Sequence, residues 1–203
     1  MEAIGNLIRQ WFPDVAAERL EAMPHPGWGG DSDAWLVDER WIFRFPRTAE
    51  VARSLAVEVC LLPRLAARLP LSIPDFVHVA RNQGQEPLFV GYEAIPGVPL
   101  SGEVLGRLSH SATDQIANEL GKFLRTLHQI PVELAIECGV APPTTSPFEA
   151  VERGYRTVRD KVYAHLGDDE RAWIGRRYEA FLAEPRHFAF APVLCHGDFS
   201  SDH

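Results

Sequence analysis

The last nine residues of the chain read Cys195-His196-Gly197-Asp198-Phe199-Ser200-Ser201-Asp202-His203, and they hold the most informative pattern in the sequence. They continue an apolar run, Pro192-Val193-Leu194-Cys195, that is typical of a buried strand. The glycine between His196 and Asp198 permits a backbone turn that a side chain would obstruct. One interpretation is an ordinary turn after a strand, because Asp and Ser favour turns.

The spacing of the polar residues supports a second interpretation. Catalytic loops of kinase type have the order His-x-Asp, four spacer residues and a metal ligand, and Asp198 precedes His203 by the same five-position step. In such a loop the aspartate accepts the proton of the attacking hydroxyl, and the later residue reaches the Mg²⁺ that bridges the nucleotide phosphates. Asp198 is therefore the candidate catalytic base and His203 the candidate metal ligand.

With these residues, the chain resembles the aminoglycoside phosphotransferase family, whose loop usually reads His-Gly-Asp-x-x-x-x-Asn. The resemblance runs from about Gly27 to His203. It implies an α+β, protein-kinase-like fold with an antiparallel-sheet N-lobe over residues 1–95 and an incomplete, mainly helical C-lobe over residues 96–203. His203 replaces the usual Asn, as in the subgroup that modifies the 2''-hydroxyl of aminoglycosides and as in the macrolide phosphotransferases.

A glycine-rich segment, Pro26-Gly27-Trp28-Gly29-Gly30-Asp31-Ser32, precedes a predicted hairpin with strands over 34–37 and 41–45. Bare backbone amides in such a loop can approach phosphate oxygens closely. Plain turn chemistry is the alternative, because the spacing is not the full GxGxxG. The candidate nucleotide-binding residues in this segment are Gly29, Gly30 and Ser32.

The second predicted strand supplies a candidate phosphate clamp. A kinase-like site needs a cation on this strand, normally Lys, but the chain has no Lys before Lys122. Arg44 alternates with Phe43 and Phe45, so it points to the other side of the strand. Its planar guanidinium can bind phosphate or carboxylate in a bidentate manner. An arginine that simply faces solvent is the alternative.

A helix predicted from Ala49 to Leu69 follows this strand. It carries Glu58 at the place where the resembling family has the glutamate that pairs with the strand cation, so we expect an Arg44–Glu58 pair. Pro63 lies inside the predicted helix, and a proline there removes a hydrogen bond and clashes with the preceding turn. We therefore expect a bend or break at Pro63.

Two further strands are predicted at 76–80 and 88–92, and they would complete an antiparallel sheet. The segment after them, 91–100, contains Pro96 and resembles the family's hinge between lobes. The resemblance implies that backbone groups from Glu93 to Ile95 hydrogen-bond the purine, so both residues are nucleotide-binding candidates.

The rest of the chain has helical patterns. An apolar stripe from Ile116 to Leu127 ends at His128, to which we assign a structural role, and helices are predicted over 148–166 and 168–182. The proline-containing loop 131–147 should be irregular. The resemblance implies that the helical region helps form the acceptor pocket, whose polyamine contacts would come from Glu149, Glu152, Asp160 and the run 168–170. A solvated acidic surface is the alternative.

Composition limits the partners. The formal charge of −8 over 203 residues argues against nonspecific nucleic-acid binding and suits a cationic acceptor. No stretch reaches the roughly eighteen apolar residues of a membrane span, and we expect a monomer. Cys60, Cys138 and Cys195 are far apart and form no CxxC pair, so neither a zinc ribbon nor a disulfide framework is indicated. The expected location is a reducing cytoplasm.

The predicted activity is transfer of the γ-phosphoryl group of ATP or GTP, with Mg²⁺, to a hydroxyl of an aminoglycoside antibiotic, which would confer resistance. A macrolide, choline, homoserine or another metabolite could be the acceptor instead, and a noncatalytic nucleotide-binding module is a third possibility. This machinery also needs a metal-binding aspartate downstream of the loop, and the sequence stops at His203. We therefore expect a C-terminally truncated enzyme that cannot catalyse efficiently.

Overall fold

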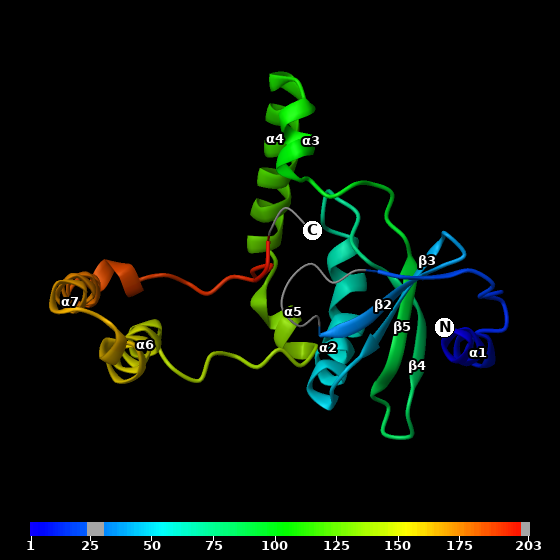
Figure 1. Cartoon of the computed structure of the whole chain (residues 1–203), viewed down its shortest axis with the longest axis horizontal. Helices are drawn as coiled ribbons and strands as arrows, with labels where there is room; N and C mark the ends of the chain where they lie inside the picture. Colours follow the sequence, from blue (N-terminus) through cyan, green and yellow to red (C-terminus); the bar gives the residue numbers. More distant parts are fainter. Residues whose placement is uncertain (24–30, 200–203) are drawn as a thin grey trace. The chain divides into compact units, whose positions relative to one another are not determined.

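The computed structural model describes residues 1–23 and 31–199, and these form two compact units (Figure 1). The first unit contains Met1–Val140 and the returning segment Val193–His203, and the second contains Ala141–Pro192. The lobe boundary expected between residues 95 and 96 is a different division and stays a prediction.

The described part of the first unit contains an antiparallel sheet of five strands in the order β1-β2-β3-β5-β4. Its members are β1 (Leu20–Ala22), β2 (Ser32–Val37), β3 (Trp41–Pro46), β4 (Phe76–Arg81) and β5 (Pro87–Glu93). Both predicted hairpins are confirmed, whereas the short strand β1 was not anticipated. The turn between β2 and β3 has Asp38 and Glu39 at φ 52° and 55°. Asp38 also accepts hydrogen bonds from the N–H groups of Ala17, Glu18 and Arg19, which fixes the chain before β1.

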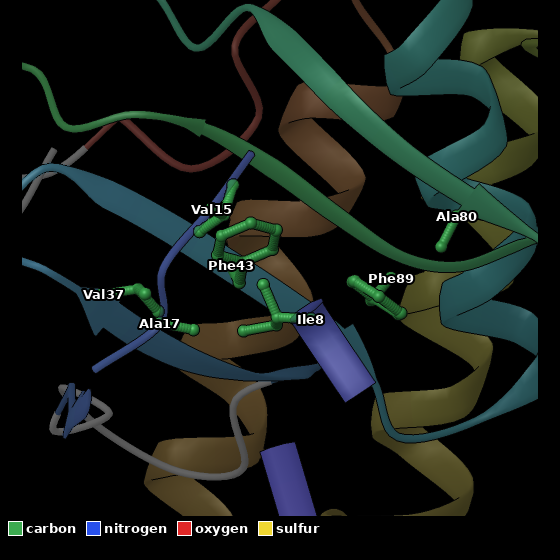
Figure 2. Close-up of a cluster of buried hydrophobic side chains, with 7 residues drawn as sticks. All are labelled: Ile8, Val15, Ala17, Val37, Phe43, Ala80 and Phe89. Atoms are coloured by element: carbon green, nitrogen blue, oxygen red, sulfur yellow. The ribbon is translucent and has the colours of Figure 1, made fainter. Parts of the chain in front are cut away.

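One face of the sheet packs against helix α1 (Glu2–Trp11) and the segment that follows it. Figure 2 shows the apolar cluster formed there by Ile8, Val15, Ala17, Val37, Phe43, Ala80 and Phe89. Gly91 of β5 lies opposite Phe43 of β3, and a Cβ on Gly91 would come within 2.5 Å of the Phe43 ring. A glycine at position 91 is therefore what allows the phenylalanine to fill this core.

The opposite face packs against helix α2 (Ala49–Ala66), so the sheet lies between α1 and α2 (Figure 1). The helix begins at Thr48, whose hydroxyl accepts the N–H of Val51. Of the bend or break expected at Pro63, the break is wrong, since the helix is continuous through that residue. Leu61 and Leu65 are buried on either side of Pro63, and this packing compensates for the missing hydrogen bond.

Three helices complete the described part of the first unit: α3 (Gly102–Arg107), α4 (His110–His128) and α5 (Val132–Glu137). Helix α4 confirms the predicted apolar stripe. Helix α5 corrects the expectation of an irregular loop over 131–147. It is short, and its buried Ala135 joins the cluster of Leu61, Leu65, Phe123, Leu127, Ile130, Ala135 and Cys138. Tertiary packing, rather than sequence periodicity, therefore explains this helix.

The expectation that no disulfide forms is also wrong. Cys60 of α2 and Cys138, the residue after α5, are joined by a disulfide across a sequence separation of 78. The fold brings their Cα atoms to 5.4 Å, a distance that spacing along the chain cannot reveal. Cys195 is free and exposed.

The second unit is built on helices α6 (Pro147–Lys161) and α7 (Asp168–Leu182), with short 3₁₀ turns at Tyr163–His165 and Pro185–Phe188. The rings of Tyr155 and Tyr178 stack 4.6 Å apart and join the two helices. The predicted helix over 168–182 is confirmed, and the one over 148–166 ends earlier, at Lys161. Among all helices within the described residues, none is both long and apolar enough to cross a membrane.

Candidate functional site

The predicted ion pair is present in the first unit. Arg44 on β3 donates from Nη1 to Oε2 of Glu58 on α2 at 2.8 Å. The side chains keep 27% and 33% of their exposure, so the pair is shielded from bulk water but remains accessible to a ligand. A partly buried carboxylate of this kind restricts the guanidinium to one direction. The geometry therefore provides a cation that is held in place on the α2 face of the sheet.

Tyr92 of β5 lies beside this pair and was not among the predicted site residues. It faces Ile42 in the strand register, as Val90 faces Arg44, so all four side chains share the α2 face. Burial raises the pKa of Tyr92, the Arg44 charge opposes this effect, and the Glu58 charge adds to it. Strand alternation from Val90 could have indicated its position, although not its closeness to two charges.

Of the three candidate nucleotide-binding residues in the glycine-rich segment, Ser32 is the one that the structure describes. It begins β2 opposite Pro46 and is 93% buried, since its relative exposure is 7%. Its Oγ has no hydrogen-bond partner within residues 1–23 and 31–199. A buried hydroxyl in this state can donate to a ligand or to the neighbouring loop. Gly29 and Gly30 lie outside the described residues.

The predicted hinge begins where β5 ends at Glu93. The Glu93 carboxylate accepts from Nε of Arg40 at 3.1 Å, and the N–H of Ala94 donates to the Arg40 carbonyl at 2.7 Å. Ile95 is exposed. The Ala94 amide is therefore already engaged, so a purine contact would use other backbone groups of this hinge. Nucleotide binding by Glu93 and Ile95 stays a prediction.

The predicted catalytic loop returns to the first unit. Phe199 stacks on Phe123 of α4 with ring centroids 6.4 Å apart, and His196 packs edge-on against Phe199. Gly197 has φ 84°, in the left-handed region, as expected for the residue between His196 and Asp198. Asp198 is exposed. Its convergence with Arg44 on one nucleotide stays a prediction.

The predicted metal ligand His203 lies outside the described residues. Within the described ranges, no group of three or more His, Cys, Asp or Glu side chains is arranged to hold a metal ion. The Mg²⁺ site thus remains an inference from the sequence.

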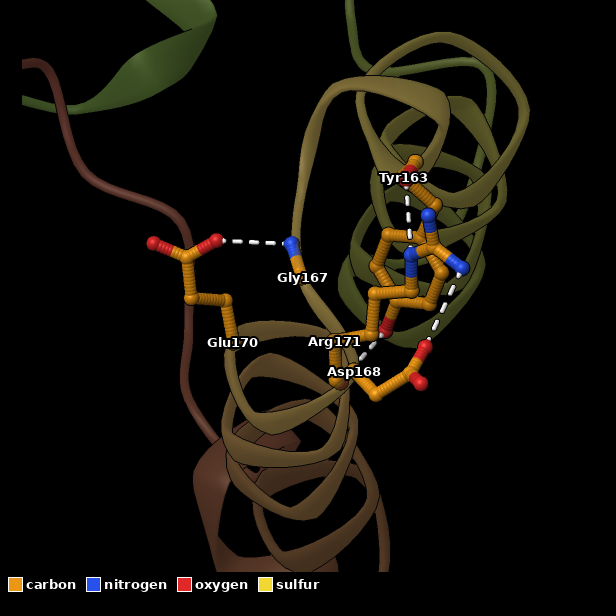
Figure 3. A network of polar contacts seen from close by, with 5 residues as sticks. All are labelled: Tyr163, Gly167, Asp168, Glu170 and Arg171. Carbon is orange, nitrogen blue, oxygen red and sulfur yellow. Dashed lines mark hydrogen bonds and ion pairs between the residues drawn. The ribbon is translucent and has the colours of Figure 1, made fainter.

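Several acidic residues of the second unit form hydrogen bonds or ion pairs with neighbouring residues at the start of their own helix. Figure 3 shows the Glu170 carboxylate accepting the N–H of Gly167 at 2.8 Å and Asp168 lying 3.4 Å from Arg171. Glu149 similarly closes a capping box with Ser146, whose backbone N–H, more than its hydroxyl, holds the pKa of Glu149 below its usual value. These carboxylates complement the positive ends of α7 and α6. These three acids thus have local structural roles, which neither the predicted polyamine contacts nor the alternative of a solvated acidic surface had included.

A shallow hollow of about 380 Å³ opens beside this network. It is lined by Leu166, Asp169, Glu170, Trp173 and Ile174. A second hollow of about 410 Å³, in the first unit, is lined by Leu71, Ala112, Gln115, Ile116, Glu119 and Leu120. The first combines an exposed indole with acidic side chains, and the second is mainly apolar.

A five-stranded antiparallel sheet, a helix whose glutamate fixes a strand cation, and a His-Gly-Asp loop define the class of kinase-like phosphotransferases. The sequence profile of the phosphotransferase enzyme family matches residues 24–203. The chain belongs to this family. Its predicted α+β, kinase-like fold is thereby confirmed.

Solved structures support the assignment. The GDP and kanamycin complex of APH(2'')-IIIa has a TM-score of 0.86 and 31% identity, with 100% of this chain and 66% of that chain covered. The ADP-bound APH(2'')-Ib has a TM-score of 0.73 and 23% identity, with 98% of this chain and 64% of that chain covered. The macrolide 2'-phosphotransferase MphH from Brachybacterium faecium has a TM-score of 0.69 and 24% identity, with 100% of this chain and 67% of that chain covered. No curated protein sequence matches. The chain thus spans slightly less than two thirds of the first two of these relatives.

Proposed function

We propose that this protein transfers the γ-phosphoryl group of ATP or GTP to a hydroxyl group of an aminoglycoside. The observation that carries the proposal is the Arg44–Glu58 pair, which holds a cation on the sheet face that a nucleotide would meet. The comparison with solved structures also supports the proposal, because the chain is 31% identical to a phosphotransferase solved with GDP and kanamycin. Because nucleoside triphosphates are abundant in the cytoplasm, we place the reaction there.

Nucleotide binding would use the first unit. Arg44 would contact the phosphates while Glu58 keeps its guanidinium in place. The glycine-rich loop with Gly29 and Gly30 would cover the phosphates through backbone amides, and the buried hydroxyl of Ser32 would support that loop. Backbone groups from Glu93 to Ile95 would hold the purine.

Phosphoryl transfer would use the loop at the end of the sequence. Asp198 would orient the acceptor hydroxyl and accept its proton as the hydroxyl oxygen bonds to the γ-phosphorus. The bond from that phosphorus to the bridging oxygen would break, releasing a nucleoside diphosphate. Mg²⁺, when bound, neutralises charge on the phosphates. His203 would hold it through a ring nitrogen, and since Mg²⁺ prefers oxygen, oxygen ligands are needed beside it.

Nucleotide binding is the first test. Titration calorimetry of the chain with GDP, GTP, ADP and ATP should show saturable binding, and Arg44→Ala should weaken it at least tenfold. Guanine nucleotides come first because the relative at 31% identity was solved with GDP. Failure of all four nucleotides to bind would remove the proposal.

Turnover is the second test, in a form of the protein as long as these relatives. Asp198→Ala should abolish nucleotide consumption with kanamycin while leaving nucleotide affinity nearly unchanged, because the carboxylate acts on the acceptor. Asp198→Asn is the isosteric control and should behave in the same way. Consumption with macrolides, choline or homoserine alone would reassign the acceptor, and unchanged turnover in both variants would remove Asp198 from its role.

A further inference from the structure

The disulfide between Cys60 and Cys138 attaches to α2, the helix that also carries Glu58 of the candidate nucleotide site. Cys60 follows Glu58 by two positions on α2, and Cys138 directly follows α5. The bond therefore ties the helix that carries the arginine's partner to a segment 78 positions further along the chain.

Noncovalent contacts reinforce the same junction. Arg64 of α2 donates to Glu137, the last residue of α5, at 3.0 Å. Gly139 turns the chain after α5 with φ 99°, and a Cβ there would lie 3.5 Å from Val57 of α2. The junction thus covers α2 from one residue before Glu58 to Arg64, and the disulfide is its one covalent link in the described chain.

The two sulfur-bearing residues differ in access. Cys138 is 8% exposed and belongs to the apolar cluster with Leu61 and Leu65, whereas Cys60 is half-buried at the margin of that cluster. An attacking thiolate would therefore reach Cys60 first. Disulfides persist poorly where thiols are kept reduced, so reducing thiols would open this bond in the location we propose, and a disulfide oxidant would be needed to close it again.

We propose that Cys60 and Cys138 form a thiol–disulfide exchange site that sets the position of α2 and, through Glu58, that of Arg44. The co-reactant is a small dithiol or a pair of monothiols. One thiolate attacks Cys60, giving a mixed disulfide and a Cys138 thiolate that takes up a proton. The second thiolate then attacks the mixed disulfide, releasing Cys60 as a thiol and the reductant as its disulfide. Two electrons pass from reductant to protein, and the reverse sequence closes the bond.

The first experiment counts thiols on the whole chain. After oxidation in aerated buffer without any added thiol or disulfide, maleimide labelling and mass spectrometry should find one modified cysteine, Cys195, and three after dithiothreitol treatment and its removal. The Cys195→Ser variant should show no labelled cysteine after oxidation and two after dithiothreitol. This result would identify Cys60 and Cys138 as the exchanging pair. Closure of the disulfide should raise the Tm of the wild-type protein by about 5–10 °C. The Tm of the Cys60→Ser/Cys138→Ser variant should be the same under oxidising and reducing conditions. Three labelled cysteines under oxidising conditions would overturn the proposal.

The second experiment tests the coupling to α2. Hydrogen–deuterium exchange over residues 49–66 should accelerate severalfold when dithiothreitol opens the bond, and the double serine variant should show the fast rate under both conditions. Equal exchange in the oxidised and reduced wild type would overturn the coupling. Exchange in α7, which belongs to the other unit, serves as the internal control and should not change.

A third measurement rests on the proposed function. Nucleotide affinity should fall about tenfold on reduction of wild type, because Arg44 then loses its fixed partner, and should be insensitive to reductant in the double serine variant. Equal affinity in both redox states would overturn the link to the site. Absence of nucleotide binding in both states, with the thiol counts and α2 exchange as expected, would overturn the proposed function and leave the exchange site supported.

Discussion

The two faces of the sheet are built on different principles. The face toward α1 is filled by fully buried Phe43, Phe89 and Ile8, whereas the face toward α2 combines buried Leu55 with the ion pair of Arg44 and Glu58. Adjacent residues of one strand thus serve opposite purposes, since Phe43 and Arg44 point to different faces. The comparison teaches that stability and chemistry can be separated across the thickness of a single sheet.

The largest effect should come from emptying the α1 face. Phe43→Ala removes a fully buried ring that contacts Phe89 and Phe12, and should lower the free energy of unfolding by about 3–5 kcal/mol. Urea denaturation measures the loss. A loss below about 1 kcal/mol would mean that the α1 face is not the main source of stability.

Adding a side chain to the packed α1 face should lower the free energy of unfolding by less than removing one. Gly91→Ala places a Cβ within 2.5 Å of the Phe43 ring and should lower the free energy of unfolding by about 1–3 kcal/mol. Gly121→Ala is the matched control, because a Cβ there meets no described atom within 4 Å. Phe43→Leu combined with Gly91→Ala should cost less than the sum of the single changes, since the leucine makes room. Strict additivity would contradict the steric explanation.

On the α2 face, Glu58→Gln should affect binding more than stability. The change removes the charge that fixes Arg44, so nucleotide affinity should fall about tenfold by calorimetry. Glu119→Gln breaks a pair with Lys122 that is also 2.8 Å long but more exposed, with side chains at 39% and 64%. It should change neither nucleotide affinity nor stability by more than about 0.5 kcal/mol. Similar affinities for the two variants would contradict the role of Glu58.

The smallest effect concerns His78, a buried histidine of the α1 face. His78 lies among the rings of Phe12, Trp41 and Phe43, and burial lowers its pKa below 6.5, with Asp14 partly opposing the shift. The folded state therefore binds fewer protons than the unfolded state, so stability is full above pH 6.5 and falls as the pH decreases below it. The loss cannot exceed about 1.4 kcal/mol per pH unit.

Chemical denaturation from pH 7.5 to 5.5 measures this loss. His78→Phe keeps an aromatic ring in the cluster and should flatten the curve relative to wild type over this interval. Identical slopes for the two proteins would show that His78 does not titrate with folding.

Sequence reasoning recovered the features that depend on periodicity. Strand alternation placed Arg44 opposite its apolar neighbours, whereas the pairing of Arg44 with Glu58 was implied by the family resemblance, and the 2.8 Å contact confirms it. It missed β1 and α5, which are too short to have a period and depend on tertiary contacts. It also missed the disulfide, because only the folded chain brings Cys60 beside Cys138.

The residues of the proposed site show the same difference between local patterns and contacts formed on folding. Individual residues could be named because each stands in a local pattern, such as Asp198 beside Gly197. Tyr92 was overlooked, since its position next to two charges results from strand pairing and from the approach of α2. Contacts between elements, such as that of Tyr92 with the ion pair, do not follow from the periodicity of a single sequence.

The continuity of α2 through Pro63 has a mechanical consequence. A proline nitrogen carries no hydrogen, so the carbonyl of Val59 receives no helical hydrogen bond from position 63. The missing bond separates the half of the helix that carries Glu58 from the half that is buried through Leu65. We therefore expect helix α2 to be least stiff between Val59 and Pro63, and the disulfide to Cys138 attaches to α2 at Cys60, within that stretch.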